Sequence, residues 1–444
     1  MTVSRTICLG FLAVIAAGTL LLMMPFSTSD GNGSDLVTAL FSSTSAACVT
    51  GLSVVDVGKY YSFWGQLFIL LLMQVGGLGY MTSTTFLLLL LGRKFSLQDK
   101  MAIQLSLDLP GMAGGLDLVR SIVVTTLLFE SVGVLLLMLV FVPDYGFNYG
   151  LWLAVFHSVS AFTNGSYSLF SNSFMDYARS PILNFTITGL IIFGGLGYQV
   201  IVELLVWLRD RLTGKSACTV FGLNFKIVVS TTFFLLVFGT LSLLVAECYN
   251  PDTFGPLNWQ QKLMAAWFHA AAARTSGFNT VDIGKMHQAS LFIIIILMFV
   301  GGAPGSMAGG IKITTFRVLL SCRDAVLRGR QEVLCYQRKI PTALILRAVA
   351  VTVGSGILVA GATAIIALSD LKLFVLQILF EVTSAFGTVG YSTGITADLS
   401  ILSKLTLIAT MYGGRVGVLL VMSALGGESK PSDISYPESN LLVG

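Results

Sequence analysis

Four short stretches of the sequence share one pattern of residue types. Each begins with an aromatic residue, continues through small Ser, Thr and Ala side chains, and ends ten residues later at glycine or, once, at serine. They are FSSTSAACVTG (41–51), FHSVSAFTNGS (156–166), WFHAAAARTSG (267–277) and FEVTSAFGTVG (380–390). Glycine permits backbone angles that other residues resist and leaves space beside the main chain. Such loops can turn carbonyl oxygens toward a monovalent cation and replace its hydration shell.

The four stretches are regularly spaced. Their end points lie 115, 111 and 113 residues apart, and a glycine-rich marker follows each of them after 23 to 28 residues. Two coupled markers at one period indicate a fourfold repeat rather than four separate surface turns. We therefore predict one selectivity filter built from three residues of each stretch: Val49, Thr50, Gly51, Asn164, Gly165, Ser166, Thr275, Ser276, Gly277, Thr388, Val389 and Gly390.

Composition places these stretches in a membrane. The 444 residues are 55% hydrophobic and only 11% charged, a balance that soluble domains do not reach. Apolar runs that could span a bilayer lie near 6–24, 62–92, 117–142, 182–208, 223–248, 289–300, 341–368 and 401–425, and two contain glycine clusters. The six scattered cysteines, without CxxC motifs, indicate neither a disulfide framework nor a structural metal site.

The repeat predicts an all-α polytopic membrane protein. Each unit would contain a helix, a pore half-helix, a filter loop and a second helix. We expect the units to span 1–105, 106–218, 219–338, where the second helix is broken, and 339–444, which includes a short C-terminal tail. The half-helix of the second unit should end near Phe162.

Basic residues predict the orientation of the units. Lys and Arg concentrate in the joints between units, whereas the segments around the half-helices are poor in them. The positive-inside rule then places the joints in the cytoplasm, so that all four units enter the membrane in the same direction. Parallel units around an axis along the membrane normal enclose a central, potassium-channel-like pore with pseudo-four-fold symmetry.

A glycine-rich segment interrupts the apolar run of the third unit. In GGAPGSMAGGIK (301–312), glycine and proline are dense enough to stop a helix, and broken backbone at membrane depth must be enclosed by protein or water. We expect this segment to lie against the pore below the filter, with Gly301, Gly302, Ala303, Pro304, Gly305, Ser306, Gly309, Gly310 and Lys312. A phosphate-binding loop is a weaker alternative, because the Gly-Lys-Ser/Thr ending is missing. Close helix packing explains GGLG at 76–79 and 194–197.

Several ionisable residues lie within apolar segments. Arg415 should face the pore or the bundle interior, because a charge in the membrane costs at least about 2.5 kcal/mol. It could form a barrier to cations or tie helices together. Glu130 has no identifiable partner, and both a structural role and an ion site are compatible with it. Glu381, His157 and His269 are expected at the starts of half-helices, where an acidic Glu381 suits the helix N-terminus and the histidines serve as packing or hydrogen-bonding groups.

These motifs resemble a known family. ACVTGL, ARTSGFNT, GTVGYS, GGAPGSMAGGIKITT, GGRVG and the terminal YPESNLLVG are similar to the membrane subunit of Ktr potassium transporters, within the Trk/Ktr/HKT superfamily. The resemblance covers essentially the whole chain. It implies a homodimer with one pore per protomer, a cytoplasmic ring of nucleotide-binding RCK-type subunits, and a gate made by Arg415 and the third-unit loop. It also implies a bacterial inner (plasma) membrane, with both termini cytoplasmic.

Three functions are compatible with the sequence. The first is passive, gated potassium uptake, with potassium as cargo at the filter, no bound cofactor, no structural metal and no nucleic-acid partner. The second is a sodium-preferring or poorly selective conductor, because Ser166 replaces a filter glycine, although Gly165 could restore flexibility. The third, a membrane enzyme, is disfavoured because the three histidines are scattered and no catalytic motif is present.

A basic stretch in the third unit could contact a cytoplasmic partner, although membrane orientation explains it equally well. It contains Arg317, Arg323, Arg328, Arg330 and Arg338.

Overall fold

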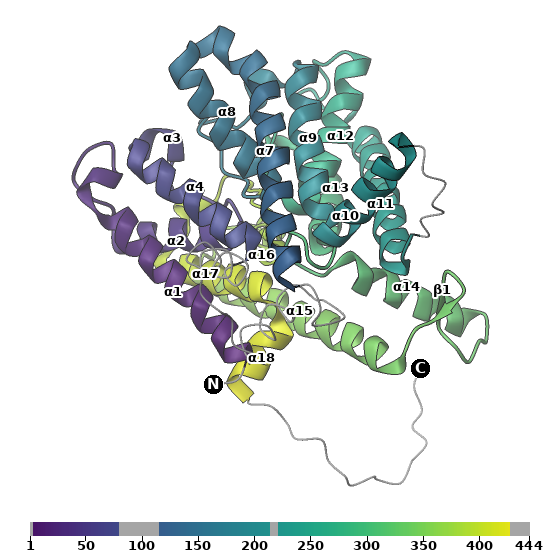
Figure 1. The fold of residues 1–444 in the computed structure, drawn as a ribbon. Coiled ribbons are helices and arrows are strands. Elements are labelled where there is room, and N and C mark those ends of the chain that lie inside the picture. The colour runs from purple at the N-terminus through teal and green to yellow at the C-terminus, as the bar shows by residue number, and fades with distance from the viewer. Residues whose placement is uncertain (1–2, 80–114, 214–220, 427–444) are drawn as a thin grey trace.

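A computed structural model describes residues 3–79, 115–213 and 221–426 of the chain (Figure 1). Two of the expected unit boundaries, at 105/106 and 218/219, lie outside these residues, and the unit limits stay predictions. Within the described ranges the chain is helical apart from its loops and the short antiparallel hairpin of β1 (Leu334–Cys335) and β2 (Arg338–Lys339).

The described helices follow the expected order four times. First helices are α1 (Val3–Met23), α7 (Gly115–Tyr145), α11 (Leu223–Glu247) and α15 (Thr342–Ser369). Pore helices are α2 (Leu36–Ala47), α8 (Phe147–Phe162), α12 (Trp259–Thr275) and α16 (Val375–Gly387). Second helices are α4 (Phe63–Leu78), α9 (Pro181–Leu196), α13 (Gln288–Phe299) and α17 (Ile401–Val416). The remaining α-helices are α3 (Val57–Tyr60), α10 (Tyr198–Leu212), α14 (Ile313–Leu327) and α18 (Val418–Gly426). The end of α8 at Phe162 confirms the expected end of that half-helix.

The four units close into a ring. The second helix of each unit packs against the pore helix of the next: α4 on α8, α9 on α12, α13 on α16, and α17 back on α2. The first and last described helices complete the closure, because α1 and α18 lie side by side and Arg5 Nε donates to the carbonyl oxygen of Ala424 (2.9 Å) (Figure 1). The same contact repeated four times is the structural basis of the pseudo-four-fold arrangement.

Short polar residues start the helices that surround the pore. Ser62, Ser180 and Ser400 precede the second helices α4, α9 and α17, and each side chain accepts a backbone N–H of the first turn. Asp35 caps α2 in the same manner, and Asn258 forms a capping box with Gln261 at α12. These caps satisfy N–H groups that a helix terminus leaves free. They fix where each helix begins on one side of the membrane.

Three second helices end at a glycine in the left-handed region. Gly79, Gly197 and Gly417 have φ of 79°, 83° and 94°. At Gly197 and Gly417 the chain turns by 107° and 98° into α10 and α18. The apolar runs 182–208 and 401–425 are therefore each two helices with a sharp bend, because only glycine adopts this conformation without steric cost.

Another glycine of each cluster allows close packing. A Cβ added to Gly76, Gly194 or Gly414 would lie less than 3.0 Å from the last carbonyl groups of that unit's own pore helix, at Ala47, Phe162 and Phe386 respectively. The expectation that GGLG supports helix packing is thus confirmed for units one and two, and it extends to unit four. Each of these three clusters therefore contains a glycine that allows close packing and, three residues later, the glycine with positive φ.

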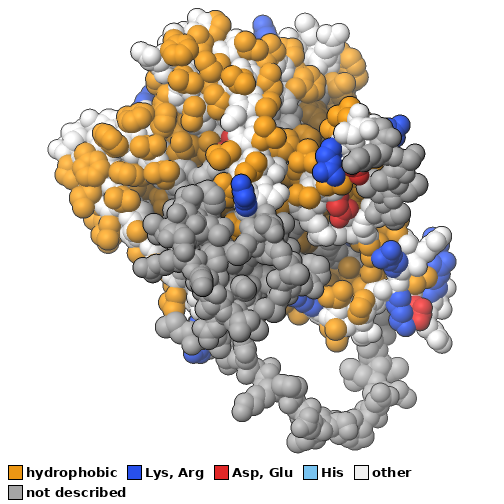
Figure 2. All heavy atoms as spheres, in the orientation of Figure 1, with side chains coloured by type: hydrophobic (Ala, Val, Ile, Leu, Met, Phe, Trp, Pro, Cys, Tyr) orange, Lys and Arg blue, Asp and Glu red, His pale blue; other side chains and the backbone are white. Residues whose placement is uncertain are grey.

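The outer surface is that of a membrane protein. Four described helices are long and apolar enough to span a bilayer, and two bent pairs raise the number to six. Apolar side chains cover the face formed by α1, α4, α7 and α8, whereas basic side chains gather near α14 and the β1–β2 hairpin (Figure 2). The chain is accordingly a polytopic helical membrane protein.

Candidate ion-conduction site

The four expected filter stretches meet at one place. A Cβ on Gly51 would lie less than 3.0 Å from Ser166, one on Gly277 would reach the backbone of Gly390, and one on Gly390 would reach Thr50 and Ser166. Residues more than 100 positions apart are thus in direct contact. All twelve expected filter residues lie in this cluster or beside it in the chain: three glycines are partly exposed, and the other nine residues are buried.

Three of the loops share one backbone conformation. In units one, two and four the end residue has positive φ (Gly51, 83°; Ser166, 62°; Gly390, 91°). The residue two positions before it does too (Val49, 58°; Asn164, 59°; Thr388, 49°). Alternating conformations of this kind direct successive backbone groups differently from a helix. The pattern explains why glycine is favoured at the end positions.

The third loop differs from the others by one residue. His157 and Glu381 lie nine residues before Ser166 and Gly390, but His269, which has the corresponding role, lies eight before Gly277. Helix α12 accordingly continues to Thr275, and neither Thr275 nor Gly277 has positive φ. The pore is therefore not fourfold in detail.

Ser166 links three units through its side chain. Its Oγ accepts the backbone N–H of Gly277 (2.7 Å) and donates to the carbonyl oxygen of Val389 (2.6 Å). A glycine would provide neither bond. The hydroxyl therefore engages one carbonyl oxygen and one N–H of the loop cluster, and it does so from a residue in the strained left-handed region.

Buried ionisable groups hold the segments that follow the filter ends. His157 Nε2 contacts Ser168 Oγ (3.1 Å) and the Leu169 N–H (3.2 Å), while His269 Nε2 contacts the Thr280 N–H (3.4 Å). Glu381 has the same role in unit four and accepts from the hydroxyl and amide groups of Ser392, Thr393 and Thr396. These contacts confirm the expectation that the two histidines are hydrogen-bonding groups. The expectation that His157, His269 and Glu381 lie at the starts of half-helices is wrong, because α8, α12 and α16 begin at Phe147, Trp259 and Val375.

In units two, three and four, an aromatic residue follows the filter end and joins neighbouring units. Tyr167 Oη donates to the carbonyl oxygens of Ser42 (3.2 Å) and Leu52 (3.3 Å) in unit one. Tyr391 Oη lies 2.8 Å from His269 Nδ1 in unit three. Phe278 of unit three packs on Phe174 of unit two, with ring centroids 4.9 Å apart. This belt of three aromatic side chains thus links the four units beside the loops.

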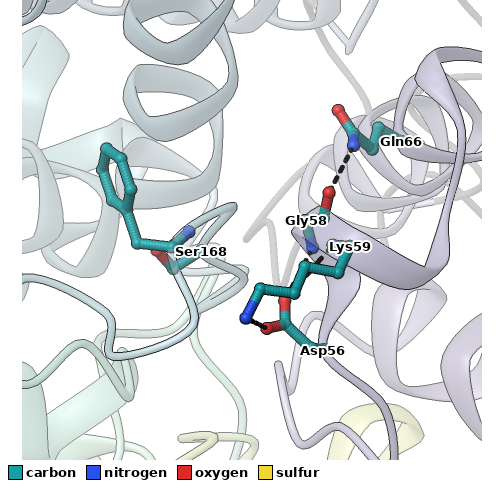
Figure 3. A network of polar contacts seen from close by, with 6 residues as sticks. Asp56, Gly58, Lys59, Gln66 and Ser168 are labelled. Carbon is teal, nitrogen blue, oxygen red and sulfur yellow. Dashed lines mark hydrogen bonds and ion pairs between the residues drawn. The ribbon is translucent and has the colours of Figure 1, made fainter.

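Outside the belt, a polar network of unit one lies on the side that faces the unit-two loop with Ser168 (Figure 3). Asp56 caps α3 by accepting the Gly58 N–H (3.1 Å), and Gln66 Nε2 donates to the carbonyl oxygen of Gly58 (3.4 Å). The backbone of Leu169 lies where a Gly58 side chain would be. The 3.6 Å pair of Asp56 with Lys59 adds little, because Lys59 is 78% exposed.

The expected gate segment forms a loop between α13 and α14. Its two ends are joined, because Gly301 N–H donates to Ile311 O (2.7 Å) and Ile313 N–H donates to Gly302 O (3.0 Å). Ala303 N–H donates to Gly195 O of unit two (2.9 Å), and Gly305 O accepts from Tyr198 N–H (3.3 Å). The break in the third unit is confirmed, and the loop packs against the bend of unit two. Pro304, Ser306, Gly309, Gly310 and Lys312 complete the loop; Lys312 Nζ donates to Ala308 O (3.0 Å).

Arg415 connects this loop to unit one. Its guanidinium donates to the carbonyl oxygens of Met307, Gly76 and Gly77, the last at 3.2 Å. The sequence indicates an inward-facing Arg415, and the structure supplies these three carbonyls as partners. Arg274, which the sequence analysis missed, lies buried at the end of α12 with Nη2 3.4 Å from Gly301 O. A charged residue within an otherwise uncharged pore half-helix stretch is the sequence feature that could have identified Arg274.

Glu130 lies behind the second pore helix. Gln74 Nε2 of unit one donates to Glu130 Oε2 (3.3 Å), and Ser158 Oγ donates to its backbone carbonyl (2.7 Å). Glu130 Oε1 and Tyr198 Oη are buried and make no hydrogen bond with any described residue. Gln74 lies 56 residues before Glu130, so no local sequence pattern identifies it as the partner. The carboxyl belongs to a unit interface and not to the filter.

Comparisons with known proteins agree with this arrangement. A family model described as "TrkH: Cation transport protein" matches residues 4–427. The chain is 35% identical over 443 residues to Ktr system potassium uptake protein B of Bacillus subtilis, covering 100% of this chain and 97% of that protein. It is 32% identical to potassium/sodium uptake protein NtpJ of Enterococcus hirae, covering 99% and 97%.

A solved structure shows the same fold. The potassium transporter TrkH from Vibrio parahaemolyticus has a TM-score of 0.73, with 17% identity, and the match covers 94% of this chain and 84% of that one. The family match and the full-length relatives confirm the resemblance found in the motifs. The chain therefore belongs to the TrkH cation transport family.

Proposed function

We propose that the chain conducts potassium ions passively across the plasma membrane, through the path between the four filter loops. The observation that carries this proposal is the convergence of Gly51, Ser166, Gly277 and Gly390 at one point inside a ring of membrane helices. Non-helical backbone enclosed in this way can present carbonyl oxygens to a dehydrated cation. Relatives named potassium uptake proteins, at 35% and 37% identity, support the choice of ion.

The proposal includes partners and orientation. A homodimer within the lipid bilayer and a cytoplasmic ring of nucleotide-binding, RCK-type subunits follow from the Ktr resemblance, with both termini cytoplasmic in a bacterial inner membrane. The basic residues near α14 and the hairpin support a cytoplasmic position for that surface. Potassium is cargo in this proposal, the chain needs no cofactor, and it has no enzymatic activity.

The intramembrane loop and Arg415 form the gate in this proposal. The loop packs against the bend of unit two, and Arg415 ties it to unit one, so the guanidinium lies among the glycine clusters below the filter. A fixed positive charge there raises a barrier to cations. The partner subunit would open the path by moving this loop.

Flux measurements test potassium conduction. Purified chain in liposomes should carry potassium or rubidium down an imposed gradient, and adding the nucleotide-binding subunit with its nucleotide should change the rate. Empty liposomes are the control. Absence of flux both with and without the subunit would contradict the proposal.

A second candidate, weaker potassium selectivity, rests on Ser166. The Ser166→Gly variant removes the bonds to Gly277 and Val389 and relieves the left-handed strain, so the potassium-to-sodium permeability ratio should rise by about fivefold, the equivalent of one hydrogen bond. Ser173→Gly is the matched control. Ser173 also has positive φ (54°) and its Oγ also accepts an N–H from unit three, at Asn279, but it lies outside the filter. An unchanged ratio in Ser166→Gly would exclude the serine as a selectivity determinant.

The gate is tested at Arg415. Arg415→Ala removes both the charge and the ties to the loop, so flux without the cytoplasmic subunit should rise about tenfold or more. Arg415→Lys keeps the charge but cannot bridge several carbonyls in the same geometry, and it separates the electrostatic from the tethering contribution. Wild-type flux in the alanine variant would remove Arg415 from the gate.

A further inference from the structure

One hydrogen bond joins the filter directly to the intramembrane loop. The backbone N–H of Gly309 donates to Thr388 Oγ1 over 3.1 Å, and Thr388 is only 1% exposed. Thr388 is the first residue after α16 and, along the chain, the first of the three expected filter residues in unit four. The bond therefore connects two parts that the conduction proposal treats as separate, namely the filter and the gate.

The contact is tightly packed. A Cβ at Gly309 would lie less than 3.0 Å from Thr388 Oγ1 and Cγ2, so only glycine fits at this point of the loop. Thr388 has φ of 49°, a conformation that β-branched residues adopt rarely and at a cost. Surrounding structure must hold it there, and the Gly309 N–H is part of that structure.

The other units do not repeat this bond. The residues at the same position are Val49, which has no hydroxyl, Asn164, whose buried amide makes no hydrogen bond with any described residue, and Thr275, which is still helical. The coupling is thus specific to unit four among the described loops. It lies in the same unit as Arg415, which holds the loop from below at Met307.

We propose that Thr388 is a positioning residue that holds the intramembrane loop against the filter. The loop cannot leave its place without breaking the bond between Gly309 N–H and Thr388 Oγ1, and loss of that bond leaves Thr388 less restrained. Movement of the gate and the conformation of the filter in unit four are therefore coupled. The functional part of this inference rests on the proposed conduction, whereas its structural part does not.

Hydrogen exchange tests the structural part without any flux. Thr388→Val keeps the shape of the side chain but removes the acceptor, so the peptide containing 300–312 should exchange about fivefold faster in lipid nanodiscs, the effect of one buried hydrogen bond. Thr388→Ser keeps the acceptor and should restore the wild-type exchange of that peptide. Thr383→Val is the control, because Thr383 is buried on α16, which ends just before Thr388, and its Oγ1 makes no hydrogen bond with a described residue.

Exchange in α11 shows whether each variant is folded. Faster exchange of 300–312 in Thr388→Val alone, with α11 unchanged, supports the proposal. Equal exchange in all four proteins overturns it, and so does faster exchange in both valine variants or failure of serine to restore protection.

Flux then tests the coupling. In liposomes without the cytoplasmic subunit, Thr388→Val should carry about fivefold more potassium than wild type, and Thr383→Val should match wild type. If the wild-type protein conducts but Thr388→Val does not differ from it, the coupling is wrong and the conduction proposal stands. If no protein conducts while the exchange result holds, the conduction proposal fails and the bond remains.

Discussion

Backbone polar groups at membrane depth must be bonded or enclosed, and this constraint organises the whole molecule. The backbone is irregular in four loops and at one helix break inside the bilayer. An unsatisfied N–H or C=O group there costs several kcal/mol. The ring of second helices on neighbouring pore helices encloses the loops. Glycines at 76, 194 and 414 allow the approach that makes this enclosure tight, because any side chain there would collide with a pore-helix carbonyl.

The same constraint explains why the units are alike in outline but different in detail. Identical packing is needed four times around the ring, whereas the centre is shared and each loop meets different neighbours. Unit two contributes Ser166, whose hydroxyl crosses to two other loops. Unit three contributes a shorter loop and the broken helix, and unit four contributes Arg415 and Thr388, which hold that break from below and above. The units thus share a symmetric frame and differ at the centre, where we propose that selectivity and gating arise.

The features that depend on local composition could be predicted from the sequence. Small residues after an aromatic indicated the half-helices, and α8 ends at Phe162 as expected. Density of glycine and proline indicated the break after Phe299. The bends at Gly197 and Gly417 were not predicted, because a glycine in a helical cluster serves packing or turning equally well. Partners such as Gln74 for Glu130 or Gly309 for Thr388 depend on how distant segments meet, which no local pattern encodes.

The position of the bound ion tests the central claim most directly. Crystals grown or soaked in rubidium should show anomalous density on the axis between the four loops, level with Thr50, Gly165, Ser276 and Val389. Rubidium is a close analogue of potassium in charge and coordination, so ligands that replace the hydration shell of one should bind the other. Density at this site would support a shared filter built from four loops. A well-ordered structure with rubidium elsewhere, for example beside Glu130, and none between the loops would contradict the account.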